Sequence, residues 1–300
     1  MNTPSSSRSG YALRSFTLQR GATLIELMVG ITIGLLTIAV ATGALMISRG
    51  ISGTVTDASQ LQQQASYAFR VFGQQLRQAG SMRLNLNAES TNPTDPILSD
   101  AAVAFVPDPL IHAIVPGASP TTPAVSGKDT PASGEYALSV AFTNYTEQSF
   151  TTALGASFFR DCLGAQPSAT IIQSQFSLEN GELRCAGSDN VPQSILRNVA
   201  DFQVRYLVQT GGATGTPTIQ IVNAATVGTN WASVFGVEVC LVLYGDEAID
   251  MPAGSSYNNC TGTAVNMTTL PIDTATIKRK NRMHMTFRNV YQLRSQGLTG

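Results

Sequence analysis

The chain has 300 residues and a formal net charge of −1, and 43% of its residues are hydrophobic while only 12% are charged. This length is sufficient for one sizeable folded domain in addition to a membrane segment. The charged fraction is about half of the soluble average, and Gly, Ser, Thr, Asn and Gln are plentiful. The composition is typical of an extracytoplasmic, strand-rich protein and argues against a cytosolic enzyme.

Residues 1–21 form a basic leader that contains Arg8, Arg14 and Arg20 and no acidic residue. The rest of the chain carries the other 15 of the 18 basic residues and all 19 acidic residues, which gives it a net charge of −4. Positive charge ahead of an apolar helix keeps that end of the helix in the cytoplasm. We therefore expect the residues after Ile47 to lie across a membrane.

An apolar segment follows the leader, and residues 22–47 are predicted to form a transmembrane helix. Leu27 to Ile47 is an uncharged stretch of 21 residues, which as a helix matches a hydrocarbon core of about 30 Å. Glu26 is the one charged residue inside the segment. A carboxylate at the edge of such a span costs free energy unless it finds a partner, so it usually marks function.

Residues 20–27 read Arg-Gly-Ala-Thr-Leu-Ile-Glu-Leu, and this stretch resembles the class III signal of type IV prepilins and pseudopilins. The resemblance implies that prepilin peptidase cuts between Gly21 and Ala22 and that the new amine of Ala22 is methylated. It also implies that Glu26 becomes the fifth mature residue, where the family holds its glutamate. Ala22 replaces the phenylalanine common in major pilins, which favours a minor subunit.

The spacing of the signal has a physical explanation. A neighbouring subunit displaced by about one helical turn could set its Glu26 against the amine of Ala22, and each charge would neutralise the other. Three interpretations compete with this one. They are a secretory signal cut after Ala41, a plain single-pass anchor, and a helix-dimer face formed by Gly30 and Gly34. The length of the apolar stretch argues against the first, and the second leaves Glu26 unexplained.

Residues 48–80 are predicted to continue the helix as an amphipathic half that packs against its own domain and ends at Gly80. A bend or local loosening is expected at Gly50 and Gly53, because glycine is unfavourable in a helix interior. Glutamines 62, 63, 74 and 75 and Arg77 are expected on the other faces. The apolar stripe recurs every three or four residues and comprises Val55, Ala58, Leu61, Ala65, Phe69, Phe72, Leu76 and Ala79.

Residues 81–135 contain eight of the 14 prolines, and a long loop of this kind is usually exposed or functional. We favour a surface insertion, and partner binding is the competing interpretation. Within the region, residues 101–106 and 110–115 could form short strands. Residues 136–300 are predicted to form the β-rich domain, with Asn180-Gly181 as a tight turn. The predicted strands are rich in β-branched and aromatic residues and cover residues 136–145, 170–178, 199–208, 218–222, 234–244 and 283–293.

Residues 234–244 are apolar nearly throughout and are predicted to be the central buried strand. Trp231, just ahead of this strand, is expected to be a core anchor rather than a ligand platform. The strands are expected to form one or two antiparallel sheets wrapped on the distal half of the helix. The predicted fold class is therefore α+β, with a long N-terminal helix packed on an antiparallel β-rich domain.

The four cysteines lie in the distal half, which is the compartment predicted to be oxidising. Four cysteines allow three pairings, and we favour the local one, Cys162 with Cys185 and Cys240 with Cys260. Each bond would stabilise the domain by roughly 3 kcal/mol on the loop-entropy argument. Zinc binding is not expected because no C-x-x-C motif occurs and the only histidines are 112 and 284.

No enzyme signature is present, and no cofactor is expected. Two histidines leave little general-base capacity, and no glycine-rich phosphate loop occurs. The densest basic stretch begins at Lys278, Arg279 and Lys280. Pilus systems can take up DNA, so these residues are candidate phosphate contacts. We favour a solvated turn that enters a strand.

The layout as a whole resembles the PilW-like family of minor type IV pilins, which is related to the J-type minor pseudopilins of type II secretion. The resemblance extends to residues 76–80, 198–206 and 287–290 and to Trp231. It implies an inner-membrane protein with a periplasmic domain that later enters a surface pilus. The partners it implies are prepilin peptidase, other minor pilins, the major pilin, the inner-membrane assembly platform and membrane lipid.

The implied function is to help initiate or cap a pilus that supports adhesion, twitching motility or DNA uptake. One alternative is a minor pseudopilin of a type II secretion system, which differs in the pathway it serves. An alternative of another class is a membrane-tethered adhesin or receptor that never enters a filament.

Overall fold

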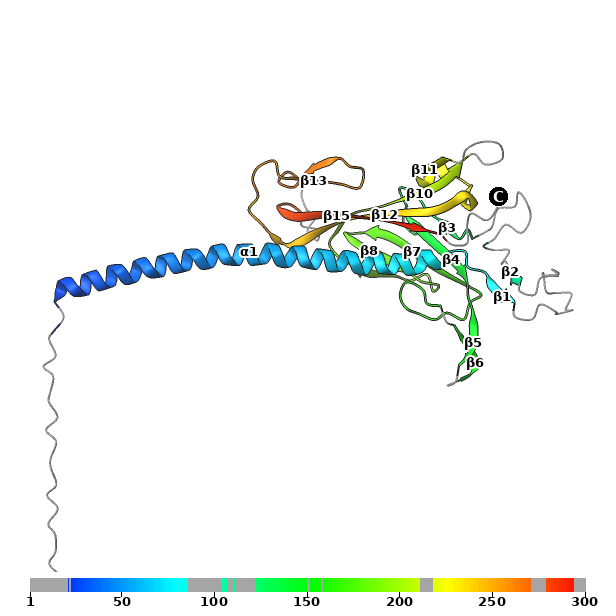
Figure 1. Cartoon of the computed structure of the whole chain (residues 1–300), viewed down its shortest axis with the longest axis horizontal. Coiled ribbons are helices and arrows are strands. Elements are labelled where there is room, and N and C mark those ends of the chain that lie inside the picture. Colours follow the sequence, from blue (N-terminus) through cyan, green and yellow to red (C-terminus); the bar gives the residue numbers. More distant parts are fainter. Residues whose placement is uncertain are drawn as a thin grey trace, which may run out of the picture. The chain divides into compact units, whose positions relative to one another are not determined.

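The computed structural model describes residues 21, 23–85, 104–106, 111, 122–149, 152–157, 159–210, 218–270 and 279–293. The chain divides into two compact units, Met1–Ile51 and Ser52–Gly300. The helix α1 (Leu24–Gln78) contributes its first part to the first unit and its remainder to the second (Figure 1). All of the described strands belong to the second unit.

The first part of α1 is exposed and apolar. Its stretch Leu24–Met46 is long and apolar enough to cross a membrane, and none of it is buried. The helix assignment continues through Gly50 and Gly53 without a break. The bend expected at these glycines stays a prediction.

The second part of α1 is amphipathic, as predicted. Leu61, Ala65, Phe72 and Leu76 are at most 2% exposed, and they recur at the three- and four-residue spacing of one helix face. The last helical residue is Gln78, and the expected stop at Gly80 follows in the next turn, where Gly80 adopts a φ of 65°. The Gly80 amide then donates a hydrogen bond of 2.9 Å to the carbonyl of Ala141.

Two assignments along this helix were wrong, one on the apolar stripe and one on the polar faces. Val55 is 63% exposed, whereas Asp57 is 4% exposed; the two lie about 200° apart around the helix, so the stripe began out of phase. Gln75, expected on a polar face, is 3% exposed. Its amide donates to the carbonyl of Arg160 at 3.2 Å and accepts from the hydroxyl of Ser174 at 2.9 Å. These bonds satisfy the buried amide.

One antiparallel sheet has four strands, and β12 lies inside it between β10 and β15. Residues 236–245 of β12 are buried without interruption, which confirms the predicted central strand. An apolar run of this kind is expected where both faces of a strand are covered. The order across the sheet is β11 (Thr218–Val222), β10 (Val199–Thr210), β12 (Val234–Ala248) and β15 (Arg282–Gln292).

A second antiparallel sheet has five strands. The turn between β7 and β8 is Asn180-Gly181, with φ values of 52° and 76°, which is the left-handed geometry that Asn-Gly favours. This predicted turn is confirmed. The order is β3 (Val125–Ser126), β4 (Leu138–Thr143), β7 (Ile171–Glu179), β8 (Glu182–Ala186) and β9 (Pro192–Leu196).

The remaining elements among the described residues are short. Three two-stranded antiparallel sheets pair β1 (Arg83–Asn85) with β2 (Ala104–Val106), β5 (Thr146–Ser149) with β6 (Thr152–Ser157), and β13 (Ser256–Asn258) with β14 (Ala264–Asn266). A short helix α2 (Ala224–Val227) and a 3-10 turn (Trp231–Ser233) precede β12. The strand β2 falls within the predicted residues 101–106. The other predicted strand, residues 110–115, lies outside the described residues except for Ile111, which is in a turn.

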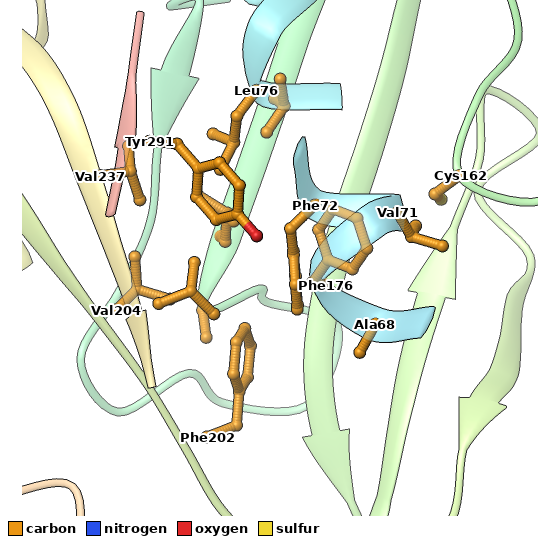
Figure 2. Close-up of a cluster of buried hydrophobic side chains, with 14 of the residues drawn as sticks. Ala68, Val71, Phe72, Leu76, Cys162, Phe176, Phe202, Val204, Val237 and Tyr291 are labelled. Atoms are coloured by element: carbon orange, nitrogen blue, oxygen red, sulfur yellow. The ribbon is translucent and has the colours of Figure 1, made fainter. Parts of the chain in front are cut away.

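The core joins α1 to both sheets (Figure 2). Phe72 of α1 lies 4.6 Å from the ring of Phe176 in β7 and 5.7 Å from the ring of Phe202 in β10. The hydroxyl of Tyr291 in β15 donates to the carbonyl of Phe69 at 2.7 Å. Gly73 faces this tyrosine, and a Cβ there would lie 3.1 Å from its ring. The α+β fold class, with the helix packed on an antiparallel β-rich domain, is confirmed.

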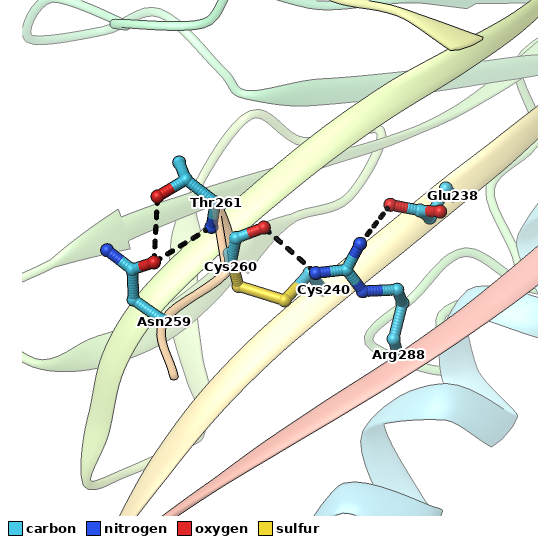
Figure 3. A network of polar contacts seen from close by, with 6 residues as sticks. All are labelled: Glu238, Cys240, Asn259, Cys260, Thr261 and Arg288. Atoms are coloured by element: carbon cyan, nitrogen blue, oxygen red, sulfur yellow. Dashed lines mark hydrogen bonds and ion pairs between the residues drawn. A yellow bond between two sulfur atoms is a disulfide. The ribbon is translucent and has the colours of Figure 1, made fainter. Parts of the chain in front are cut away.

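Disulfides join Cys162 to Cys185 and Cys240 to Cys260, the two local pairings favoured from the sequence. The second bond ties β12 to the segment between β13 and β14. Arg288 supports the same connection, because it pairs with Glu238 at 3.1 Å and donates to the carbonyl of Cys260 at 2.9 Å (Figure 3).

Candidate processing and assembly site

The candidate site is the start of α1. Gly21 is exposed, and no heavy atom lies within 4 Å of the position that a Cβ would take there. The helix begins three residues later, at Leu24. Ala22 and the leader residues 1–20 lie outside the described residues. Of the two residues at the predicted cleavage position, the structure therefore describes Gly21 alone.

Glu26 forms a capping box with Thr23. The carboxylate Oε2 of Glu26 accepts from the Thr23 amide at 3.0 Å and from the Thr23 hydroxyl at 3.1 Å. In return the Glu26 amide donates to the Thr23 hydroxyl at 3.3 Å. These bonds satisfy amides that the first helical turn leaves without partners. The carboxylate is thereby held at the positive end of the helix dipole.

The sequence contains the signal for this cap, a threonine followed three residues later by a glutamate ahead of an apolar run. The sequence-based interpretation missed it because it considered Glu26 only as a partner for a neighbouring subunit. None of the ion pairs between described residues involves Glu26. Within its own chain the carboxylate therefore has hydrogen bonds to Thr23 and no described cationic partner.

The rest of the apolar segment presents side chains to its surroundings. Leu24, Leu36 and Met46 are 74%, 67% and 73% exposed. A contiguous apolar surface of this extent requires lipid or other helices as its environment. No heavy atom lies within 4 Å of a Cβ built at Gly30 or Gly34, so these positions leave room on the helix surface.

The polar side chains within the segment are satisfied inside the helix. The hydroxyls of Thr32, Thr37 and Thr42 donate to carbonyls of the preceding turn at 3.0, 2.8 and 2.8 Å. Such bonds lower the cost of a hydroxyl in a hydrocarbon environment. Glu26 is therefore the only charged group that the stretch Leu24–Met46 would bring to a membrane.

Asp57 holds the second part of α1 on the four-stranded sheet. Its carboxylate accepts from the amide of Glu247 at 3.1 Å. A Cβ at Gly245 would lie 2.2 Å from the same carboxylate oxygen, so this approach requires glycine. The sequence did not indicate this contact, because its two partners are 190 residues apart.

The described residues of the basic stretch lie in different environments. Lys278 lies outside them, Lys280 is exposed, and Arg279 donates to the carbonyl of Ala200 at 3.1 Å. Asn281 has a φ of 56° in the turn that leads into β15. The turn expected ahead of the strand is therefore present, and the DNA contact stays a prediction.

His284 is buried in an aromatic stack. Its ring lies 4.5 Å from the ring of Tyr257 and 5.7 Å from that of Tyr244. Burial, together with the nearby charges of Arg279 and Arg282, lowers the pKa of His284 to about 4. The imidazole is therefore neutral near pH 7. No group of three or more potential metal ligands occurs among the described residues.

Comparisons with known proteins give a loose likeness to solved structures. No family model matches this chain, and no curated protein sequence matches it. Among solved structures the chain is similar to a type IV-like pilin from Thermus thermophilus, with 13% sequence identity and a TM-score of 0.35. The match covers 79% of this chain and 97% of that chain.

Proposed function

We propose that this chain is a minor type IV pilin that helps to initiate or cap a pilus. The observation that carries the proposal is the start of α1. There an exposed apolar stretch of 23 residues contains one charge, Glu26, directly after a basic leader that ends in Arg20-Gly21. The cap formed with Thr23 would serve any helix, whereas a filament subunit also needs one group that fixes its axial register.

The chemistry follows from the capping box. Prepilin peptidase would cut after Gly21 and leave a positive amine on Ala22, which is then methylated. Both hydrogen bonds that the Glu26 carboxylate accepts from described residues use Oε2, and the lone pairs of Oε1 would then accept from the amine of a neighbouring subunit. Thr23 would then be a positioning residue, since it fixes the carboxylate at the helix end before that amine arrives.

The remaining features fit this cycle. Before assembly, lipid would cover the apolar helix, with the basic leader in the cytoplasm and the β domain in the periplasm. The two disulfides suit that oxidising compartment. During assembly the platform and the other pilins would replace lipid on the same helix surface. Cleavage, methylation and entry into a filament are parts of the proposal.

Replacement of Gly21 by proline tests the processing step. The variant should accumulate as unprocessed precursor, because proline fixes the backbone where the peptidase must bind. The matched control is Gly43→Ala, which lies in the same apolar helix and has no heavy atom within 4 Å of its Cβ position. Mature-length protein from the Gly21→Pro strain would contradict the proposal.

The location of the wild-type protein separates the three candidate functions. A pilin should be found in sheared surface pili, and a deletion strain should lose those pili. A pseudopilin deletion should instead lose secreted enzymes. A tethered adhesin or receptor should remain entirely in the membrane fraction, and that result would end the proposal of a filament subunit.

A further inference from the structure

The second unit contains an open cavity of about 590 Å³ that the pilin role does not use. The segment from Ser126 to Ser139 forms one side, and α2 and Trp231 form the other. All of its lining residues lie in the part of the chain that the structure describes. Its charged lining residues are Lys128, Asp129 and Glu135.

The first side of the cavity is a clamped loop. The amide of Lys128 donates to the carbonyl of Tyr136 at 3.2 Å, and the side chain of Lys128 pairs with Glu135. The other carboxylate oxygen of Glu135 accepts from the amide of Ala132 at 3.0 Å. A loop held in this way loses little further conformational entropy when a ligand binds.

Asp129 joins the two sides. Its two carboxylate oxygens accept from the amides of Ala224 and Ala225 in α2, each at 2.9 Å. Gly127 allows the loop to lie close to the core, since a Cβ there would lie 2.2 Å from both the carbonyl oxygen of Ala137 and the hydroxyl of Tyr206. The cavity is therefore built by contacts between segments almost one hundred residues apart.

Trp231 provides an aromatic surface of fixed orientation. Its ring lies 4.9 Å from the ring of buried Tyr206 at an interplanar angle of 82°, a favourable edge-to-face arrangement. Trp231 is half-buried and packs against the core, as expected of a core anchor. It also lines the cavity.

We propose that this cavity binds a neutral saccharide. A pyranose ring has apolar C–H faces that suit an aromatic side chain, and hydroxyls that suit ammonium and carboxylate groups. One lysine against two acids gives the lining a net negative charge, which disfavours an anionic ligand. The lining combines Trp231 and small apolar residues with the charged Lys128, Asp129 and Glu135, and this mixture suits a ring that has both C–H faces and hydroxyls. This inference does not depend on the pilin role.

The test uses the full chain in a detergent without a sugar headgroup. Trp231 is the only tryptophan, so intrinsic fluorescence reports directly on the cavity. The probes are lactose and N,N′-diacetylchitobiose, with anionic 3′-sialyllactose as the comparison. At least one neutral disaccharide should produce a saturable change at concentrations up to tens of millimolar, the range of a weak single-ring site, and sialyllactose should bind more weakly.

Ligand-observed NMR then tests the residues, because substitution of Trp231 removes the fluorescent reporter. Trp231→Leu should weaken binding about tenfold, the loss expected for one aromatic contact. The double variant Lys128→Gln, Glu135→Gln should also weaken it about tenfold, and it spares the core contact if Trp231→Leu fails to fold. The matched control is Tyr67→Ala, an exposed aromatic outside the cavity.

Three results with the probes and the cavity variants would overturn the proposal, and a fourth concerns the control variant. They are the absence of saturable binding by either neutral disaccharide, equal binding by sialyllactose, and unchanged affinity in both the folded Trp231→Leu variant and the double variant. Loss of binding in Tyr67→Ala would place the site elsewhere and would also overturn it. None of these results bears on cleavage after Gly21, so a failure here is distinct from failure of the pilin proposal.

Discussion

Replacement of Phe72 by alanine tests whether the second part of α1 is integral to the β-rich domain. Phe72 is fully buried and lies against Phe176 of one sheet and Phe202 of the other. Truncation of a buried phenylalanine to alanine costs about 4 kcal/mol through lost burial and the cavity left behind. A domain is stable by about 5–15 kcal/mol in total, so the variant should lose a large part of its stability.

The assay is urea denaturation of the full chain in detergent with disulfides intact, followed by the fluorescence of the single Trp231. The midpoint should fall while the slope stays unchanged. Tyr67→Ala is the matched control, because Tyr67 is an aromatic on the same helix that is 43% exposed; its effect should be within about 0.5 kcal/mol. A loss below about 1 kcal/mol in Phe72→Ala would refute the packing argument.

Three further predictions address the cap, the buried histidine and a disulfide. Thr23→Val should be processed normally but enter filaments less efficiently, since it loses a cap contact of about 1 kcal/mol. Thr23→Ser keeps the hydroxyl and should enter filaments normally, whereas Glu26→Ala should not enter filaments. Wild-type filament content in Glu26→Ala would remove the register argument. The pKa of His284 falls from 6.5 in the unfolded chain to about 4 in the folded domain. The contribution of neutral His284 to the free energy of unfolding is therefore fully present above pH 6.5. As the pH falls towards 4, the free energy of unfolding decreases by about 3 kcal/mol from this group. Denaturation at stepped pH should show this loss, and His284→Phe should remove that part of it; an identical acid profile would contradict the assignment. Joint replacement of Cys240 and Cys260 by serine should lower the free energy of unfolding by about 3 kcal/mol, and an unchanged denaturation midpoint would show that the bond adds nothing.

Local patterns were enough to predict much of the fold. The central strand β12 could be predicted because a long apolar run is unfavourable in an exposed loop. The strand β11 has the predicted bounds, 218–222. The Asn180-Gly181 turn followed from backbone geometry alone. In each case the determining physics lies within a few neighbouring residues, so no knowledge of distant partners was needed.

Features that depend on distant partners were missed. Gln75 is buried because Ser174 and Arg160 satisfy its amide, and a glutamine alone does not indicate such partners. The strands β8 and β9 were not predicted, because polar residues interrupt the apolar pattern that marked the other strands. They form because β7 and β8 supply ladders for them.

The candidate site divides in the same way. The signal at residues 20–27 and the role of Glu26 could be proposed from the sequence. The Thr23 cap could also have been predicted, because Thr23 and Glu26 have the spacing of a capping box. The cavity beside Trp231 was not, because Asp129 and α2 meet only in the folded domain.

Mass spectrometry of the N-terminus of native protein tests the central claim most directly. Our account predicts a mature chain that begins at Ala22 with a methylated amine. A first residue beyond Ala41, or an intact leader, would contradict it.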